Sequence, residues 1–214
     1  MSEKIALVTG ASRGLGAALS ETLSATHHVV AVARTTGALE DLDDRVKAKG
    51  GKMTLAPMDI TKKDALAFLC NSIFNRWGSI DIWAHPAIHA SPLAPANSLD
   101  IKDLEKTIST NVKALGVLIP LVAPLLKDTS TALFFDDPQA GKKFFSAYGA
   151  SKAAQVAIAK SWQEENKRIG PNIVIATPAP MPTATRARFY PGEDKTVLSD
   201  PKSEAQMILA SLIK

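Results

Sequence analysis

Short apolar runs alternate with longer amphipathic segments along the whole chain, and this alternation constrains the fold more than any other feature. Strands that alternate with helices form right-handed βαβ crossovers, which build a parallel sheet covered by helices on both faces. The predicted strands are Ile5–Thr9, Val29–Ala33, Met53–Ala56, Ile80–Ala84, Thr131–Phe135 and Asn172–Ala176. Helices are predicted at residues 15–26, 37–49, 62–76, 100–126 and 147–168.

The chain is long enough for one domain with a substantial core, and nothing in it suggests a division. It has 214 residues, of which 46% are apolar, and no repeat or linker, so we expect residues 1–214 to form a single domain. The Pro-rich stretch 177–182 predicts a stiff loop at the carboxyl edge of the sheet, where open α/β sheets bind ligands. Residues 178–200 form the expected substrate or lid loop and match no specific pattern.

Composition argues against several classes of protein. The net charge is only +4 and no long block of like charge occurs, which argues against a nucleic-acid partner. The single cysteine, Cys70, excludes an internal disulfide framework and suits a reducing compartment. The N-terminal residues show no signal-peptide pattern, and no apolar run is expected to reach membrane-spanning length. We therefore expect a soluble, cytoplasmic protein without a membrane partner or a metal site.

A glycine-rich turn joins the first predicted strand to the first predicted helix. Its glycines have the spacing Gly-x-x-x-Gly-x-Gly rather than G-x-G-x-x-G. Glycines permit the turn and let backbone N–H groups approach a pyrophosphate at the positive end of the helix. An ordinary glycine-bearing turn is the alternative, but the position after the first strand favours a dinucleotide site. The expected binding residues are Gly10, Ser12, Arg13, Gly14, Leu15 and Gly16.

The end of the second predicted strand indicates which cofactor binds. NAD-binding domains place a carboxylate about 20 residues beyond the glycines to hold the ribose 2′-hydroxyl. Here the strand is followed by Arg34, and the first acidic residue is Glu40. Arg34 and Arg13 offer positive charge for a 2′-phosphate, which favours NADP(H) over NAD(H); two solvated arginines are the alternative. Asp59, after the third strand, either accepts from the adenine amino group or belongs to the cap region of helix 62–76.

A tyrosine and a lysine lie four residues apart in the last predicted helix. Tyr148 and Lys152 therefore share one helix face. A lysine ammonium favours ionisation of a nearby phenol, whose usual pKa is about 10. Such a pair can donate and accept a proton in carbonyl chemistry. The motif is common by itself, and its meaning comes from the glycine turn upstream.

Together these motifs resemble the short-chain dehydrogenase/reductase superfamily over residues 4–183. The resemblance implies an α/β fold of the Rossmann type, with a doubly wound parallel sheet of six strands in a three-layer α/β/α arrangement. The residues that carry it are Thr9–Gly16, Asp59, Asn111, Tyr148 and Lys152, in this order.

The resemblance also implies roles for individual residues. In the family the tyrosine donates or accepts the substrate proton, and the lysine holds the nicotinamide ribose and lowers the tyrosine pKa. An asparagine holds a water in the proton relay. These roles fall on Tyr148, Lys152 and Asn111. Pro178 matches the proline of the family's Pro-Gly after the sixth strand, so it joins Tyr148 and Lys152 among the expected cofactor-binding residues.

The family's catalytic serine has no counterpart in this chain. It lies about thirteen residues before the tyrosine and donates to the substrate oxygen, yet no Ser or Thr occurs from residue 132 to 145. Either Phe135 or Asp136 takes its place, depending on the register; Asp137 follows, with no assigned role. A phenylalanine forms no such bond, and an ionised aspartate would repel an alkoxide. Losing one such donor typically lowers the rate by about 10²–10³.

Two further departures concern the turn after the fourth strand and the C-terminal region. The family's Asn-Asn-Ala-Gly reads His85-Pro-Ala-Ile88, so a proline removes a backbone donor and a branched residue replaces glycine. His85 and His89 could act as acid–base groups, although a packed or solvent-exposed histidine is the favoured interpretation of each. Ordinary members add a final strand after the sixth, and no such strand is expected here.

These observations predict an NADP(H)-dependent oxidoreductase that interconverts a carbonyl and a secondary alcohol. Tyr148 would be the general acid/base, Lys152 its electrostatic partner and Asn111 the relay residue. The alternative is a dinucleotide-binding sensor or partner subunit without turnover, because the cofactor motifs are better preserved than the catalytic ones. We also expect a homodimer formed through the helices around residues 100–126 and 147–168, as in the family.

Overall fold

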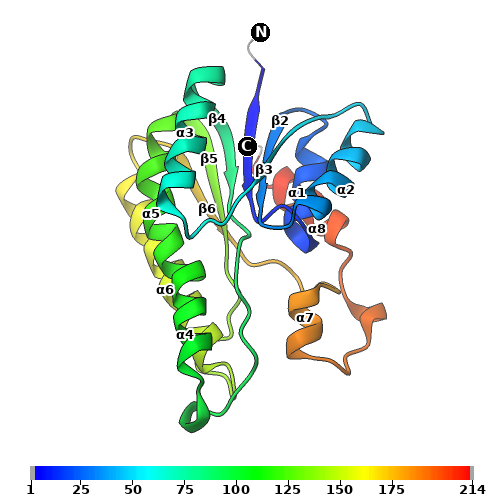
Figure 1. Ribbon diagram of the computed structural model, residues 1–214, viewed down its shortest axis with the longest axis vertical. Coiled ribbons are helices and arrows are strands. Elements are labelled where there is room, and N and C mark those ends of the chain that lie inside the picture. Colours follow the sequence, from blue (N-terminus) through cyan, green and yellow to red (C-terminus); the bar gives the residue numbers. More distant parts are fainter. Residues whose placement is uncertain (1–2, 213–214) are drawn as a thin grey trace.

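The computed structural model describes residues 3–212 and shows one parallel sheet of six strands in the order β3-β2-β1-β4-β5-β6 (Figure 1). This is the predicted Rossmann-type arrangement. No further strand follows β6 in the part of the chain that the structure describes. The strands are β1 (Ile5–Thr9), β2 (His28–Ala33), β3 (Lys52–Pro57), β4 (Ile80–Ala84), β5 (Leu126–Phe135) and β6 (Asn172–Ala176).

Helices cover both faces of the sheet. In Figure 1, α3, α4, α5 and α6 lie on one side and α1, α2 and α8 on the other, which gives three layers. The bounds are α1 (Gly14–Leu23), α2 (Thr36–Lys47), α3 (Lys63–Trp77), α4 (Ile101–Ile108), α5 (Ala114–Val122), α6 (Ser146–Glu165), α7 (Ala184–Phe189) and α8 (Pro201–Ala210).

The central strands explain why the sequence shows continuous apolar runs. Every residue of β1 and β2 is buried, as expected for strands covered on both faces. On the side of α5 and α6, Trp83 of β4 is fully buried and packs edge-on against Phe134, with ring centroids 5.2 Å apart. Trp162 of α6 completes this aromatic cluster. The core therefore fixes α6 against β4 and β5.

The strand order places one ligand-binding edge at the centre of the sheet. The chain runs outward from β1 to β3 and then returns to form β4 on the other side of β1. The crossovers that leave β1 and β4 therefore diverge, which opens a crevice at the carboxyl ends of these strands. The Pro-rich stretch 177–182 follows β6 at this same edge, as predicted from sequence.

The predicted helix 100–126 differs most from the structure. It is divided into α4 and α5 by a π-helical segment, Ser109–Lys113, and β5 begins at Leu126, five residues before the predicted Thr131. Short π-helical insertions occur inside α-helices, and they are frequently found at functional sites. Asn111 lies inside this segment and is fully buried.

The continuous helical stretch Ile101–Leu125 is long enough to span a membrane, and an 18-residue window within it is apolar enough, with a mean hydropathy of 1.5. The expectation that no apolar run reaches this length was therefore wrong. A core helix of a globular domain passes the same test, and Leu115, Leu118 and Val122 are buried in the core beside the sheet.

Two helices in the C-terminal region were missed from the sequence. The stretch 178–200 is not a plain loop, because it contains α7, with Thr183 as its N-cap. α8 is capped by Asp200 and packs against α1. The buried Glu204 of α8 accepts a hydrogen bond from the backbone N–H of Ala179, at 2.9 Å. This hydrogen bond from Ala179 to Glu204 ties the Pro-rich stretch to α8.

Candidate active site

A cavity of about 630 Å³ lies at the carboxyl edge of the sheet. The residues that line it come from the glycine turn, from the ends of β2, β4 and β5, from α6 and from the segment that includes α7. The predicted cofactor-binding residues that line it are Gly10, Ser12, Arg13, Gly14, Leu15, Gly16, Arg34, Asp59, Tyr148, Lys152 and Pro178. The structure thus brings this whole predicted set to one cavity, whereas Asn111 does not line it.

The glycines of the turn are required by close backbone contacts. Gly10 has φ +92°, and a Cβ there would lie 2.7 Å from the backbone of Ala87. A Cβ on Gly16 would overlap the carbonyl oxygen of Gly10. The first turn of α1 therefore packs directly on the end of β1, and the altered turn after β4 packs on both. Pro86 also contacts this junction, since a Cβ on Gly16 would lie 3.2 Å from its Cγ.

The N-terminus of α1 fits a pyrophosphate. Its N-cap, Arg13, has an extended backbone. The Arg13 side chain accepts no capping hydrogen bond from the N–H groups of the first turn, so it leaves them available to a ligand. The helix dipole favours an anion there. Gly14 has φ +54°, and a Cβ there would lie 3.1 Å from Cγ2 of Thr183, the N-cap of α7. The residues present therefore fit the diphosphate of a dinucleotide, between α1 and the chain that precedes α7.

Two arginines and an aspartate line the part of the cavity next to β2 and β3. Arg34 and Arg13 are exposed, and neither forms an ion pair within residues 3–212. Asp59 accepts from both the backbone N–H and the hydroxyl of Thr61, each at 2.9 Å, and so stabilises the turn before α3. Burial alone would raise the pKa of Asp59, but these bonds and the charge of Arg34 outweigh it and lower the pKa. Asp59 thus serves the turn and also lines the cavity.

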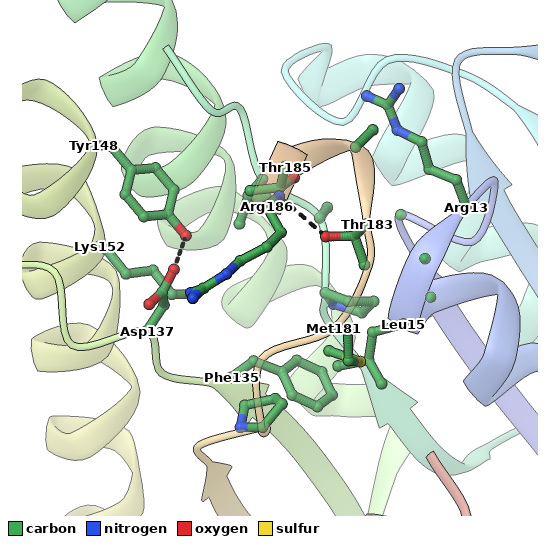
Figure 2. A pocket seen from close by; sticks show the side chains of 18 of the residues that line it. Arg13, Leu15, Phe135, Asp137, Tyr148, Lys152, Met181, Thr183, Thr185 and Arg186 are labelled. Atoms are coloured by element: carbon green, nitrogen blue, oxygen red, sulfur yellow. Dashed lines mark hydrogen bonds between the residues drawn. The ribbon is translucent and has the colours of Figure 1, made fainter. Parts of the chain in front are cut away.

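Tyr148 faces a carboxylate at the mouth of the cavity. Its hydroxyl donates to Oδ2 of Asp137 at 2.9 Å, and Figure 2 shows the two side chains pointing toward one another. The sequence predicts Phe135 or Asp136 at the position of the missing serine, whereas the residue that accepts the hydrogen bond of the phenol is Asp137. Phe135 and Asp136 also line the cavity, and the charge of Asp136 acts on the phenol from there.

A glycine explains how Asp137 reaches the phenol. Gly149 follows Tyr148 in α6, and a Cβ there would lie 2.7 Å from the carbonyl oxygen of Gln139. The loop after β5 can therefore pack directly on α6. Gln139 is buried and donates from Nε2 to Oδ1 of Asp137 at 2.8 Å. Both carboxylate oxygens thus have a donor, which fixes the carboxylate beside the phenol.

Lys152 lies one helical turn below Tyr148 and is almost fully buried, with 4% of its surface exposed. Its ammonium donates to Oε1 of Gln155 at 2.6 Å. Burial lowers the pKa of Lys152 from 10.5 to about 8, although the negative charges of Asp137 and Asp136 oppose this change. An ammonium in this position is poorly solvated and available to a polar ligand in the cavity.

The pKa of Tyr148 changes in the direction opposite to the sequence expectation. Burial raises the pKa of the phenol, and the carboxylates of Asp137 and Asp136 raise it further. The expected lowering by Lys152 does not appear in this environment, because the phenol is desolvated and donates to an anion. Tyr148 therefore holds its proton firmly, and a bound cofactor or substrate would have to change this environment before the phenol could act as an efficient acid.

Asn111 links three elements and positions Tyr148. Its Oδ1 accepts from the backbone N–H of His89 at 2.6 Å, and its Nδ2 donates to the His89 carbonyl oxygen at 3.0 Å. The same Nδ2 donates to Oγ of Ser151 at 2.9 Å, and that hydroxyl donates to the carbonyl oxygen of Tyr148. Both polar atoms of the Asn111 side chain are thus hydrogen-bonded to other protein groups. A water of a proton relay would therefore have to bind to the backbone of the π-helical segment.

The two histidines after β4 are packing residues. His85 is buried beside Thr9, with Nδ1 2.6 Å from its hydroxyl, and burial together with the charge of Lys152 lowers its pKa to about 3. His89 is partly buried, and burial lowers its pKa as well. Both rings are therefore neutral at pH 7.

The segment that includes α7 lines the cavity, and its Phe189 packs on the ring of Tyr148 in α6, with ring centroids 4.8 Å apart. Arg186 forms a bidentate ion pair with Glu193 and lies over the ring of Tyr190, 4.1 Å from its centroid. Arg188 donates to the carbonyl oxygen of Ala90 at 2.8 Å, which joins the segment to the loop after β4. These contacts hold α7 over the cavity mouth.

Several residues that line the cavity were missed from the sequence. A threonine after Pro182 signals a helix start, so α7 was within reach of sequence reasoning. No sequence signal identifies which aromatic residues of this segment face inward. The missed residues are Asp137, Gln139, Thr183, Arg186, Phe189 and Tyr190.

Comparison with known proteins gives consistent matches. A family model described as short chain dehydrogenase matches residues 4–194. A fatty acyl-CoA reductase of Acinetobacter baylyi is 30% identical over 168 residues, which cover 76% of this chain and 57% of the reductase. This chain thus spans little more than half the length of that relative. An uncharacterized oxidoreductase of Staphylococcus epidermidis is 28% identical over 216 residues, which cover 99% of this chain and 90% of that protein.

Solved structures share the fold. A short chain dehydrogenase from Pseudomonas syringae superposes with a TM-score of 0.91 at 24% identity, covering 99% of this chain and 89% of the other. One from Shigella flexneri, complexed with NADP, has a TM-score of 0.87 at 22% identity, covering 99% and 92%. At these identities the likeness shows the fold alone.

The buried Lys152 leads to a prediction about stability and pH. Its folded-state pKa of about 8 lies below its usual 10.5, so the charged side chain destabilises the fold below pH 8. This penalty decreases between pH 8 and 10.5, where the folded state has lost the proton and the unfolded state keeps it. We expect the free energy of unfolding of Lys152→Met, relative to wild type, to fall by up to about 3 kcal/mol between pH 7 and pH 10.5.

Urea unfolding of both proteins across this pH range measures the difference, in which contributions common to both cancel. Lys160→Met, at an exposed position of the same helix, is the control and should change stability by less than about 0.5 kcal/mol. A difference for Lys152→Met that stays constant with pH would contradict the prediction.

Proposed function

Because the chain belongs to the short-chain dehydrogenase family, we propose that it is an NADP(H)-dependent oxidoreductase that interconverts a carbonyl and a secondary alcohol. The observation that carries the proposal is a single cavity lined both by the glycine turn at the start of α1 and by Tyr148 with Lys152 of α6. A dinucleotide held at the turn and a substrate held at the phenol would therefore share one cavity.

In this proposal the residues of the chain bind the cofactor and move the proton. The N–H groups at the start of α1 would hold the pyrophosphate, and Lys152 would donate to the nicotinamide ribose. The bound nicotinamide supplies or accepts the hydride. Tyr148 would donate its proton to the substrate oxygen during reduction. Its raised pKa opposes this donation, and the charge of Lys152 would offset the negative charge that develops on the phenolate.

We propose NADP(H) as the preferred cofactor. Arg34 follows β2 directly and lines the cavity, and Arg13 lines it from the glycine turn. Both guanidinium groups are exposed and make no ion pair with any residue from 3 to 212, so both are available to a 2′-phosphate.

A dinucleotide-binding sensor without turnover is the second candidate, and one observation favours it. Tyr148 uses the proton that it would have to give to the substrate in a hydrogen bond to Asp137. A carboxylate beside a developing alkoxide also repels it. For a neutral carbonyl substrate, both effects oppose catalysis where the family's serine would assist it.

The cofactor proposal predicts that Arg34→Ala loses most of the preference for NADPH over NADH. Removing one charge-assisted contact to a phosphate weakens binding by about 1.5–3 kcal/mol, or roughly tenfold to a hundredfold. NADH affinity should stay nearly the same, because NADH lacks that phosphate. Isothermal titration with both cofactors measures this, with the exposed Arg168→Ala as a matched loss of charge elsewhere. Equal affinity of wild type for both cofactors would refute the proposal.

The catalytic proposal predicts opposite effects for two substitutions. Tyr148→Phe should abolish reduction of carbonyl compounds and leave NADPH affinity nearly intact. Asp137→Ser should raise the rate on neutral ketones by up to about 10²-fold, since it removes the repelling charge and restores a hydroxyl donor. Asp136→Ser is the control, because Asp136 lines the same cavity while the phenol donates its hydrogen bond to Asp137.

Steady-state NADPH oxidation over a panel of ketones measures these rates. If wild type and Asp137→Ser both bind NADPH and reduce no ketone, the sensor function is the better account.

We also propose that the protein is a cytoplasmic homodimer whose subunits contact each other through α5 and α6. Gly116, Ala153 and Ala157 are exposed on these helices, which leaves their outer faces flat and free of long charged side chains at those positions. A flat face of this kind lets helices of two subunits approach closely. Multi-angle light scattering should give a dimer for wild type and a monomer for Ala157→Glu. A monomeric wild type at micromolar concentration would refute this assembly.

A further inference from the structure

The carboxylate of Asp137 stands where a substrate oxygen must approach Tyr148, and this has a consequence for the substrate. We propose that the site acts on compounds with an amino group next to the reacting carbon, namely vicinal amino alcohols and amino ketones, whose ammonium binds Asp137. The inference rests on the proposed oxidoreductase function of this same site and specifies its substrate class.

The position of Asp137 is held by the protein and is not a chance surface charge. Its Oδ2 accepts from Tyr148 at 2.9 Å and its Oδ1 accepts from the buried Gln139 at 2.8 Å. An ionised carboxylate offers about four acceptor positions, so each oxygen can still accept from a ligand. Asp137 lines the cavity and forms no ion pair with any of the described residues.

A neutral carbonyl compound leaves Asp137 as an obstacle. The phenol has one proton and donates it to Asp137 in the structure, so a carbonyl oxygen must compete with a carboxylate for it. Charge-assisted bonds of this kind are roughly twice as strong as neutral ones. The carboxylate therefore wins unless another donor takes its place.

A vicinal ammonium removes this obstacle with matching geometry. Nitrogen and oxygen on adjacent carbons are separated by about the length of one hydrogen bond. The phenol oxygen and Oδ2 of Asp137 are also one hydrogen bond apart, at 2.9 Å. The ammonium can thus donate to Asp137 while the carbonyl oxygen accepts from Tyr148. The ammonium replaces the phenol as donor, and its positive charge offsets the repulsion between Asp137 and the developing alkoxide.

Aromatic rings next to Asp137 also favour a cation. The rings of Tyr148 and Phe189 lie 4.8 Å apart, and both line the cavity together with Phe135 and Tyr190. Aromatic faces attract an ammonium group, most strongly where water is excluded. One face of Tyr190 is already covered by Arg186, so the other rings are the ones available.

The charges of Lys152 and Arg186 act on Asp137, but no cation among residues 3–212 forms an ion pair with it. Arg186 lies near it but is paired with Glu193. Lys142 is exposed at the cavity rim, and Lys152 donates to Gln155. Asp136 adds a second carboxylate to the lining. The acidic pair therefore remains available to a cationic substrate.

The reaction balances for this substrate class. In reduction, the carbonyl carbon gains a hydride as NADPH becomes NADP⁺, and the pair of the C=O π bond moves to oxygen. The oxygen takes the phenolic proton of Tyr148, which is replaced from solvent. The ammonium keeps its protons throughout, and the product is a protonated amino alcohol.

Binding tests the inference without relying on turnover. The probes are 2-amino-1-phenylethanol, protonated at pH 7, and 1-phenylethane-1,2-diol, which has the same skeleton without the charge. Isothermal titration into wild type, with and without NADP⁺, should show tighter binding of the amino alcohol by about tenfold or more. Asp137→Asn should lose this preference. Asp136→Asn should keep most of it, because the carboxylate that is hydrogen-bonded to the phenol is that of Asp137.

Three results would overturn the inference: equal affinity of wild type for the two probes, an unchanged preference in Asp137→Asn, or an equal loss in both variants. NADPH titration of each variant reports on folding, and Asp137→Glu should restore part of the preference. Failure of wild type to bind NADPH would instead refute the proposed oxidoreductase function. Intact NADPH binding with reduction of neutral ketones and equal probe affinities would refute only the substrate class.

Discussion

The close backbone approach at the centre of the sheet is the constraint on which the site depends. The first turn of α1 lies so close to the end of β1 that a Cβ on Gly16 would overlap the carbonyl oxygen of Gly10. Gly10 in turn packs against Ala87 of the turn after β4. This contact spans the switch point between β1 and β4, so it sets both the direction of α1 and the floor of the cavity. The substitutions in His85–Ile88 preserve it, since Ala87 keeps the small side chain at the point of contact.

The opposite wall of the cavity concentrates groups that are unfavourable to bury. Lys152 and Tyr148 are almost fully buried, and burial lowers the pKa of the lysine and raises that of the tyrosine. The network through Asn111 and Ser151 holds them in place from the π-helical segment. Buried groups with strongly changed pKa values cluster at functional sites. Burying such groups destabilises the folded state, and proteins retain them where function depends on them. In this wall the protein gives up stability for a reactive arrangement.

Asp137 gives this site a character of its own. With a serine opposite the tyrosine, a donor faces the substrate oxygen; here an acceptor faces it, and the phenol is engaged before any substrate arrives. Such a site discriminates by charge, since a substrate that brings a positive group compensates Asp137 and a neutral one does not. The missing serine and the additional carboxylate can therefore be understood as one change of specificity instead of two separate losses.

The sequence by itself determined the sheet and the set of residues at its edge. The apolar runs and glycine spacing act locally, and parallel strands bring their carboxyl ends together whatever the loops contain. For this reason residues as distant in sequence as Arg34, Asp59 and Pro178 could be predicted to bind one cofactor, and in the structure all three line one cavity.

Only the tertiary structure decided that Asp137 faces Tyr148, that the phenol pKa rises, and that α7 lines the cavity. These depend on how the loop after β5 packs on Gly149 and on which charges remain near a buried group. Long-range packing and desolvation of this kind leave no periodic signal in the chain.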